Sequence, residues 1–159
     1  MAVDFSKFDK MVNQDDIQKQ MDAAPEFDDV PKGRYIVDIK AMEVKPTKKG
    51  DKLMFSVQMQ IVETVDAPKN QNKRYIFFNR VIFGNKVTDK WNDGVAIKGV
   101  ITWIDELFDG GANLEFKSYE QLAMDVLDIF QELSGNIQVE VNYDPDAFNP
   151  ISIEDVIDL

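Results

Sequence analysis

Residues 53–61 read Leu-Met-Phe-Ser-Val-Gln-Met-Gln-Ile, and every second side chain from Leu53 to Ile61 is apolar. A repeat of two is the period of a β-strand with one buried face. The positions between them include Ser56, Gln58 and Gln60, so the other face is expected to meet water. This stretch predicts a half-buried antiparallel strand, and the neighbouring segments can be arranged around it.

The segment before this strand has the same period. Its apolar side chains share one face, with Met42 on the other: Tyr35, Val37, Ile39 and Ala41. Residues 45–52 then contain Pro46, Gly50 and four lysines, which is the composition of an exposed turn. The two strands are therefore predicted to form a hairpin with a basic tip.

Residues 73–83 read Lys-Arg-Tyr-Ile-Phe-Phe-Asn-Arg-Val-Ile-Phe, a strongly β composition that is aromatic on both faces. Alternation places Tyr75 and Phe77 opposite Phe78, so only one of these sets can face a ligand. We predict that Arg74, Phe78 and Arg80 form the outward set.

Two helices are predicted near residues 95–109 and 118–133, because the apolar spacing changes there to that of a helix. Ser118 and Gln121 fit a capping box at the start of the second helix, and Gly135 lies where a helix C-terminus favours glycine. Alternation returns at residues 137–141 and 148–159, which predicts a final hairpin. The sequence does not decide between this strand and an alternative in which only the last four or five residues hang free.

The element order is three strands, a helical segment and two strands. This is the order of the OB fold, a five-stranded Greek-key β-barrel, although an α+β sandwich fits the same order of strands and helices. We therefore expect a mainly β protein, an OB-like barrel with helices, in residues 31–159.

Residues 1–30 are predicted to form an N-terminal amphipathic arm or helix. Phe5, Phe8, Met11 and Val12 recur on one face of a helix. The arm is expected to pack on the barrel or on a second subunit, which favours a homodimer.

The chain has no Cys and no His. Disulfides, thiolate nucleophiles, Cys/His zinc sites and catalytic triads are excluded by this inventory. Pairs of acids such as Asp105 with Glu106, Asp125 with Asp128, and Asp144 with Asp146 have spacings that are ordinary for exposed surfaces. We expect a protein that is not an enzyme and uses no cofactor or metal. Without a signal peptide or an apolar run of membrane-spanning length, it is expected in the cytoplasm.

Charge is strongly segregated along the chain, whose net charge is −11. Residues 1–30 carry three Lys and eight acids, residues 31–90 carry thirteen Lys or Arg and six acids, and residues 91–159 carry two Lys and fifteen acids. A dipolar surface that confers only solubility would explain this split. The basic block is also aromatic, however, and single-stranded nucleic acids require both cations and flat side chains.

The candidate site follows from this coincidence. Its cations would neutralise phosphates and its rings would stack on bases, so it needs no catalytic residue and reads little sequence. The candidate nucleic-acid-binding residues are Arg34, Lys40, Lys48, Lys49, Lys52, Lys73, Arg74, Tyr75, Phe78, Arg80, Lys86 and Trp91. Trp91 is as well placed to cap the barrel as to stack on a base, whereas Trp103 is assigned to the core.

Several short segments together resemble a phage and prophage family long labelled as of unknown function. They are residues 4–10, 30–37, 48–51, 74–83, 116–119 and 148–153. That family is similar to phage single-stranded-DNA-binding proteins with an OB barrel. The resemblance implies DNA replication or recombination in the host bacterial cytoplasm, beside a phage recombinase, helicase or polymerase. It also implies a final strand where many such binders carry a free acidic tail.

Two functions are therefore carried forward. The first is sequence-tolerant binding of single-stranded DNA without turnover. The second is a protein adaptor of the phage replication machinery, in which the arm and the acidic helices dock a partner and the basic strands are incidental.

Overall fold

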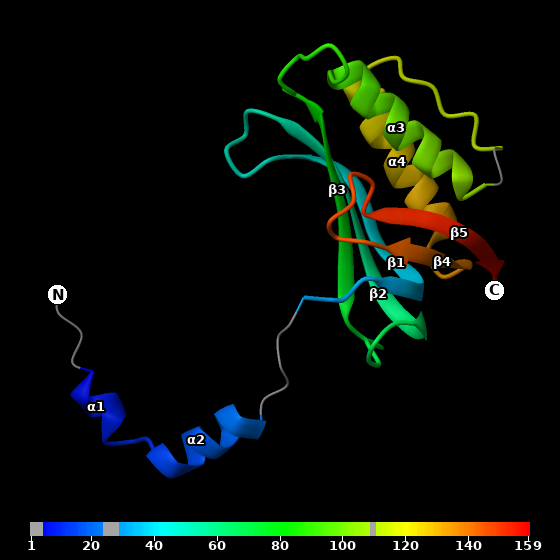
Figure 1. Cartoon of the computed structure of the whole chain (residues 1–159). Helices are drawn as coiled ribbons and strands as arrows, with labels where there is room; N and C mark the ends of the chain where they lie inside the picture. Colours follow the sequence, from blue (N-terminus) through cyan, green and yellow to red (C-terminus); the bar gives the residue numbers. More distant parts are fainter. Residues whose placement is uncertain (1–4, 24–28, 109–110) are drawn as a thin grey trace.

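The computed structural model describes residues 5–23, 29–108 and 111–159 (Figure 1). The elements are α1 (Ser6–Asp9), α2 (Gln14–Ala23), β1 (Gly33–Pro46), β2 (Leu53–Asp66), β3 (Tyr75–Phe83), α3 (Asp93–Glu106), α4 (Tyr119–Leu133), β4 (Ile137–Tyr143) and β5 (Ile151–Asp158). The predicted strands and both predicted long helices are present, with ends that differ by a few residues. Residues 1–4, 24–28 and 109–110, on which the ends of the predicted arm and of the first predicted helix fall, lie outside the described residues.

The five strands form one antiparallel sheet in the order β3-β2-β1-β4-β5. β1 is the central strand: it pairs with β2 from Arg34 to Pro46 and with β4 over Gly33–Val37. Within the described residues, no strand pairing joins β3 to β5, so the hydrogen-bonded sheet is open. The prediction of a mainly β protein with helices is confirmed, while the backbone pairing does not close a barrel.

A β-bulge in β1 changes which side chains face the core. The register against β2 shifts between Ile39 and Ala41. Because an extra residue reverses the alternation, Met42 is buried and Ala41 is only partly buried. The prediction that Ala41 continues the buried face and Met42 the exposed face was wrong for this reason.

The helices cover the inner face of the sheet, with α4 packed against β1 and α3 against β3. Figure 1 shows both helices on one side of the strands. Trp103 of α3 lies at the centre of the core: its ring stacks on Phe78, with centroids 5.3 Å apart, and meets the edge of Phe55 at 6.1 Å. Its indole N–H donates to the Ile151 carbonyl at 3.3 Å. One side chain therefore links α3 to β2, β3 and β5, and the assignment of Trp103 to the core is confirmed.

The ends of α4 follow the predicted chemistry. The Ser118 side chain accepts a hydrogen bond from the Gln121 backbone N–H, and the Gln121 side chain reaches back to the Ser118 backbone N–H, so the capping box is complete. Gly135 follows the helix with φ of +77°, a left-handed conformation that glycine adopts without strain. These two signals turn the chain into and out of α4.

The C-terminus is a strand almost to its last residue. β5 ends at Asp158, and the Leu159 backbone N–H donates to the Asn136 carbonyl at 3.0 Å. The predicted final strand is confirmed. The alternative in which four or five residues hang free was wrong, because β5 pairs with β4 as far as Asp158.

The N-terminal arm contains two helices, and in Figure 1 they lie apart from the sheet. Every side chain from Phe5 to Asp22 is exposed. Asn13 starts α2, because its side-chain oxygen accepts from the backbone N–H groups of Asp15 and Asp16 at 3.0 and 3.3 Å. The helix α1 carries Phe8 of the predicted apolar face, and α2 was not predicted, because its sequence is polar and carries only Ile17 and Met21 as large apolar side chains. The arm's exposed side chains do not support the prediction that it packs on the barrel.

Candidate nucleic-acid interface

The sheet surface turned away from α3 and α4, here called the outer β2–β3 face, carries two exposed aromatic rings. Tyr75 is 43% exposed and Phe77 is 52% exposed. Their cross-strand partners on β2 are Gln60 and Gln58. Rings flanked by amides form a flat surface with hydrogen-bonding groups at its edge, which can stack on planar ligands.

The predicted choice of face on β3 was wrong. Phe78 is only 4% exposed, and its ring packs against Trp103 and Phe55. The reason is register: Phe78 pairs with Val57, which points into the core, whereas Phe77 pairs with Gln58. Tyr75 keeps its place among the candidate site residues, and Phe77, which the predicted set did not include, joins it.

Arg80 shares the inner side of the sheet with Phe78 rather than the outer face. Its guanidinium carbon lies 5.5 Å from the ring centroid of Phe78, 5.3 Å from that of Trp91 and 4.8 Å from that of Phe148. Burial lowers the pKa of this guanidinium from its ordinary value, because desolvation penalises the charged form. An arginine still stays charged at neutral pH, so this ring cluster surrounds a cation.

Two hydrogen bonds fix Arg80 to the turn before β5. Its Nη2 donates to the Phe148 carbonyl and to Asn149 Oδ1, both at 3.2 Å. The side chain thereby connects β3 with the β4–β5 turn, across the gap in the backbone pairing. The predicted outward set of Arg74, Phe78 and Arg80 does not form.

A carboxylate organises the loop that places Trp91. Asp93 accepts from the Gly84 N–H at 3.2 Å and from the Asn85 N–H and side-chain amide, both at 2.8 Å. Asn85 in turn accepts from the Trp91 indole N–H at 3.1 Å. Desolvation raises the pKa of Asp93, but the hydrogen bonds from Asn85 and Gly84 outweigh it and the net pKa is lowered.

Asp93→Asn is expected to destabilise the fold by about 1–3 kcal/mol at neutral pH, because hydrogen bonds to a charged acceptor are lost. Since the folded-state pKa of Asp93 is depressed, the stabilisation is present above the unfolded-state pKa of about 4 and is lost as pH falls through the folded-state pKa. Urea unfolding between neutral and acidic pH measures the difference. The control is Asp89→Asn, because Asp89 is exposed and lies in the same loop. If the loss of unfolding free energy in Asp93→Asn did not become smaller at acidic pH, this role of Asp93 would be contradicted.

Lysines gather at the tip of the sheet, where the β1–β2 turn and the β3–α3 loop extend from the same end (Figure 1). Lys48 and Lys49 are exposed in the turn. Lys52 lies against Gly84, since a Cβ added there would approach its Cγ to 2.8 Å, and Lys86 follows two residues later in the loop. Within the described residues, none of these four lysines forms a salt bridge. These four lysines are here called the basic tip.

The remaining predicted cations are more scattered. Arg34 and Lys73 are exposed, at the start of β1 and just before β3. Lys40 forms a salt bridge with Asp38 at 3.8 Å, and Arg74 donates to Gln71 Oε1 at 2.6 Å. The structure thus brings Lys73 and Arg74 beside Tyr75, the four tip lysines together, and Arg80 with Trp91, while Arg34 and Lys40 lie on β1.

Comparison with known proteins identifies the family. Residues 15–144 match the family described as "Protein of unknown function (DUF669)". The chain belongs to this DUF669 family. No curated protein and no solved structure matches the chain significantly.

The DUF669 match contains β1 to β4 and both long helices, and so includes Tyr75, Phe77, Arg80 and the basic tip. It ends at Asp144, at the start of the turn that carries Phe148 and Asn149. None of the described helices is both long and apolar enough to cross a membrane.

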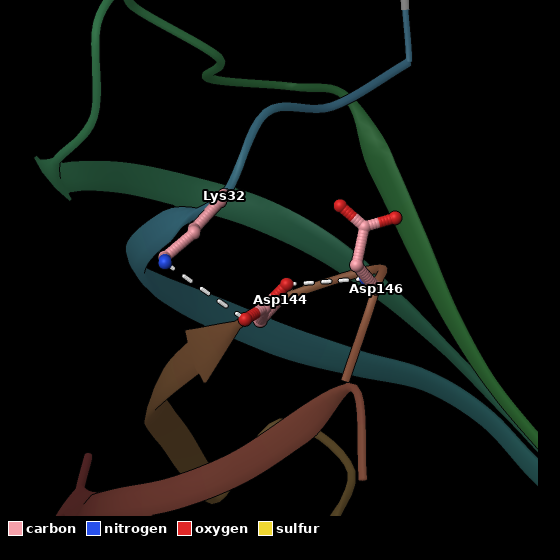
Figure 2. A network of polar contacts seen from close by, with 3 residues as sticks. All are labelled: Lys32, Asp144 and Asp146. Carbon is pink, nitrogen blue, oxygen red and sulfur yellow. Dashed lines mark hydrogen bonds and ion pairs between the residues drawn. The ribbon is translucent and has the colours of Figure 1, made fainter. Parts of the chain in front are cut away.

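The acidic pairs are not arranged as metal ligands. Among the residues that the structure describes, no three acidic side chains come together in a way that could hold a metal ion. Figure 2 shows that Asp144 instead forms an ion pair with Lys32 at 3.9 Å and accepts from the Asp146 backbone N–H at 3.1 Å, with the Asp146 carboxylate directed elsewhere. Asp144 shapes the β4–β5 turn and ties it to the start of β1.

Sequence reasoning missed three functional candidates: Phe77, Phe148 and Asn149. The signal for Phe77 was its place beside Gln58 in the strand pairing, which requires the register of β2 against β3. Phe148 and Asn149 lie in a turn without periodicity, 68 and 69 residues from the Arg80 that they contact.

Proposed function

We propose that this chain binds single-stranded DNA without turnover, along the outer β2–β3 face and the basic tip. The observation that carries the proposal is the exposure of Tyr75 and Phe77 side by side on one strand face, with Lys73 and the tip lysines on either side of them. Rings stack on bases regardless of sequence, and lysines neutralise the phosphates between them. Cations without acidic partners provide the counterion release that drives such binding.

Charge separation supports the same orientation. The acids Asp38 and Glu43 of β1 are each neutralised by a lysine two residues further on, at 3.8 and 3.5 Å. The acidic residues of the chain lie mainly in residues 91–159, which form α3, α4 and the last two strands. A polyanion is therefore expected to approach first at the tip and the outer face.

We further propose that the sheet is an OB-type barrel closed by side chains. Strands β3 and β5 lie at opposite edges of the sheet order, yet Arg80 bonds to the turn before β5 and Trp103 bonds to Ile151 of β5. OB barrels are often partly open, and their second and third strands bind oligonucleotides. This proposal agrees with the resemblance to phage single-stranded-DNA-binding proteins, and with it we propose a role in replication or recombination in a host bacterial cytoplasm.

One observation favours the second candidate, an adaptor that binds a replication protein or a second copy of itself. The arm exposes Phe5, Phe8, Met11 and Val12, and a soluble chain rarely exposes so many large apolar side chains without a partner. An adaptor would bind oligonucleotides weakly at every salt concentration.

Salt dependence separates the two. If each of the four tip lysines neutralises one phosphate, affinity for single-stranded DNA should fall about 50-fold between roughly 50 and 200 mM salt, with a log–log slope near −2.8. Anisotropy of a labelled oligothymidylate measures this, with the matching duplex as comparison. Lys48→Ala/Lys49→Ala should reduce the slope by about 1.4. Absence of binding at low salt would overturn DNA binding and favour the adaptor.

A further inference from the structure

A pocket of about 450 Å³ opens between the edge of β3, α3 and the start of β5. Four aromatic rings contribute to its wall: Phe78, Trp91, Trp103 and Phe148. This volume is within the range of small-molecule sites, which are mostly apolar with a few placed polar groups. The pocket is separate from the outer β2–β3 face, because its β3 residues point to the inner side of the sheet.

Arg80 is the polar group best placed in this pocket. Its Nη2 is used by the Phe148 carbonyl and Asn149, but its Nε and Nη1 find no acceptor among the described residues. Rings on several sides hold the guanidinium in place, so these donors are preorganised. A ligand that fills the pocket can accept from them.

The pocket favours an aromatic and anionic ligand. Phe148 is 68% exposed, so part of its ring is open for stacking, although the ring lies perpendicular to that of Trp91 and Arg80 lies over it. The charged residues of the lining are Arg80, Lys98 and Glu106, which leaves a positive balance. A nucleotide combines a flat base, carbonyl oxygens for a guanidinium and a phosphate for a lysine.

We propose that this pocket takes one nucleobase of the bound single strand, stacked on Phe148, with a base carbonyl oxygen accepting from Arg80. The inference rests on the proposed DNA binding and adds a specific subsite to it. Thymine and guanine carry a carbonyl oxygen for this contact, whereas adenine does not. The strand would pass from the outer β2–β3 face around the edge of β3 to reach the pocket.

The chain provides its own reporter, because both of its tryptophans line the pocket. Oligothymidylate should quench tryptophan fluorescence in parallel with the anisotropy change. Phe148→Ala should weaken binding about 5- to 150-fold and abolish most of the quenching, as expected for loss of one stacked base. Arg80→Lys, which keeps the charge, should weaken oligothymidylate binding more than oligoadenylate binding.

Phe116→Ala is the matched control, since Phe116 is an exposed ring outside the pocket; circular dichroism checks that each variant folds. Trp91→Phe and Trp103→Phe each leave a single tryptophan as the reporter. If oligothymidylate changes the anisotropy but quenches the fluorescence of neither variant nor of the parent, the pocket is not a base subsite, while DNA binding stands. Absence of anisotropy change at low salt would overturn both. If an acidic peptide with a C-terminal phenylalanine quenches the fluorescence and oligothymidylate does not, the pocket binds a protein partner and not a nucleobase.

Discussion

Replacing Tyr75 and Phe77 together by alanine is expected to weaken single-stranded DNA binding by at least about 30-fold, since each stacked base contributes roughly 1–3 kcal/mol. Both rings are largely exposed and make no aromatic contact within the described residues, so their removal leaves the core intact. The salt slope should stay nearly unchanged, because no phosphate contact is lost. Anisotropy titration at fixed salt measures the effect.

The matched control exchanges the rings instead of removing them. Tyr75→Phe/Phe77→Tyr keeps two flat side chains at the same positions and should bind within a few-fold of the parent. Alanine substitution of Met124 and Leu127, exposed apolar side chains on α4, should also leave binding unchanged. A double alanine variant that binds like the parent would show that the outer β2–β3 face does not meet DNA.

Trp103→Ala is expected to lower the free energy of unfolding by about 3–5 kcal/mol, the usual cost of truncating a buried large aromatic residue. The residue is 7% exposed, stacks on Phe78 and donates to the Ile151 carbonyl. Such a loss is a large part of the roughly 5–15 kcal/mol that keeps a domain folded. Urea unfolding followed by circular dichroism measures it.

Trp91→Ala makes the same chemical change at a half-buried site, so it should lower the free energy of unfolding clearly less than Trp103→Ala does. Trp103→Phe should fall between the two, since it keeps an apolar ring but loses the hydrogen bond to Ile151. Equal costs for Trp103→Ala and Trp91→Ala would contradict the central place of Trp103 in the core.

The parts of the fold that depend on local patterns were predictable. Alternation from Leu53 to Ile61 locates β2 and its buried face, and the Ser118 and Gln121 pair locates the start of α4. Interleaved apolar residues near the C-terminus also predicted β5 correctly. Each of these signals lies within a few residues of the structure that it specifies.

Predictions that needed contacts between distant segments were wrong. The bulge after Ile39 shows only in the register against β2, and it reverses Ala41 and Met42. The face of β3 depends on the pairing of Phe77 with Gln58. Because β3 is aromatic on both faces, its own sequence gives equal support to either orientation.

The candidate site shows the same division. The exposure of the lysines in the β1–β2 turn was predictable, since lysines in a turn with Pro and Gly are exposed whatever the fold. How the predicted site residues group in space was not predictable. Arg80 belongs to a ring cluster with Phe148, and Lys52 lies beside Gly84. The predicted set of cations therefore divides into separate groups around the sheet.

Photo-crosslinking tests the central claim most directly. An oligothymidylate bound at low salt is irradiated, the protein is digested, and modified peptides are located by mass spectrometry. We predict adducts on the segment that contains Tyr75 and Phe77, which disappear when unlabelled single strands compete but persist with duplex competitor. Adducts confined to the N-terminal arm or to α4, with none on β3, would contradict DNA binding on the outer β2–β3 face.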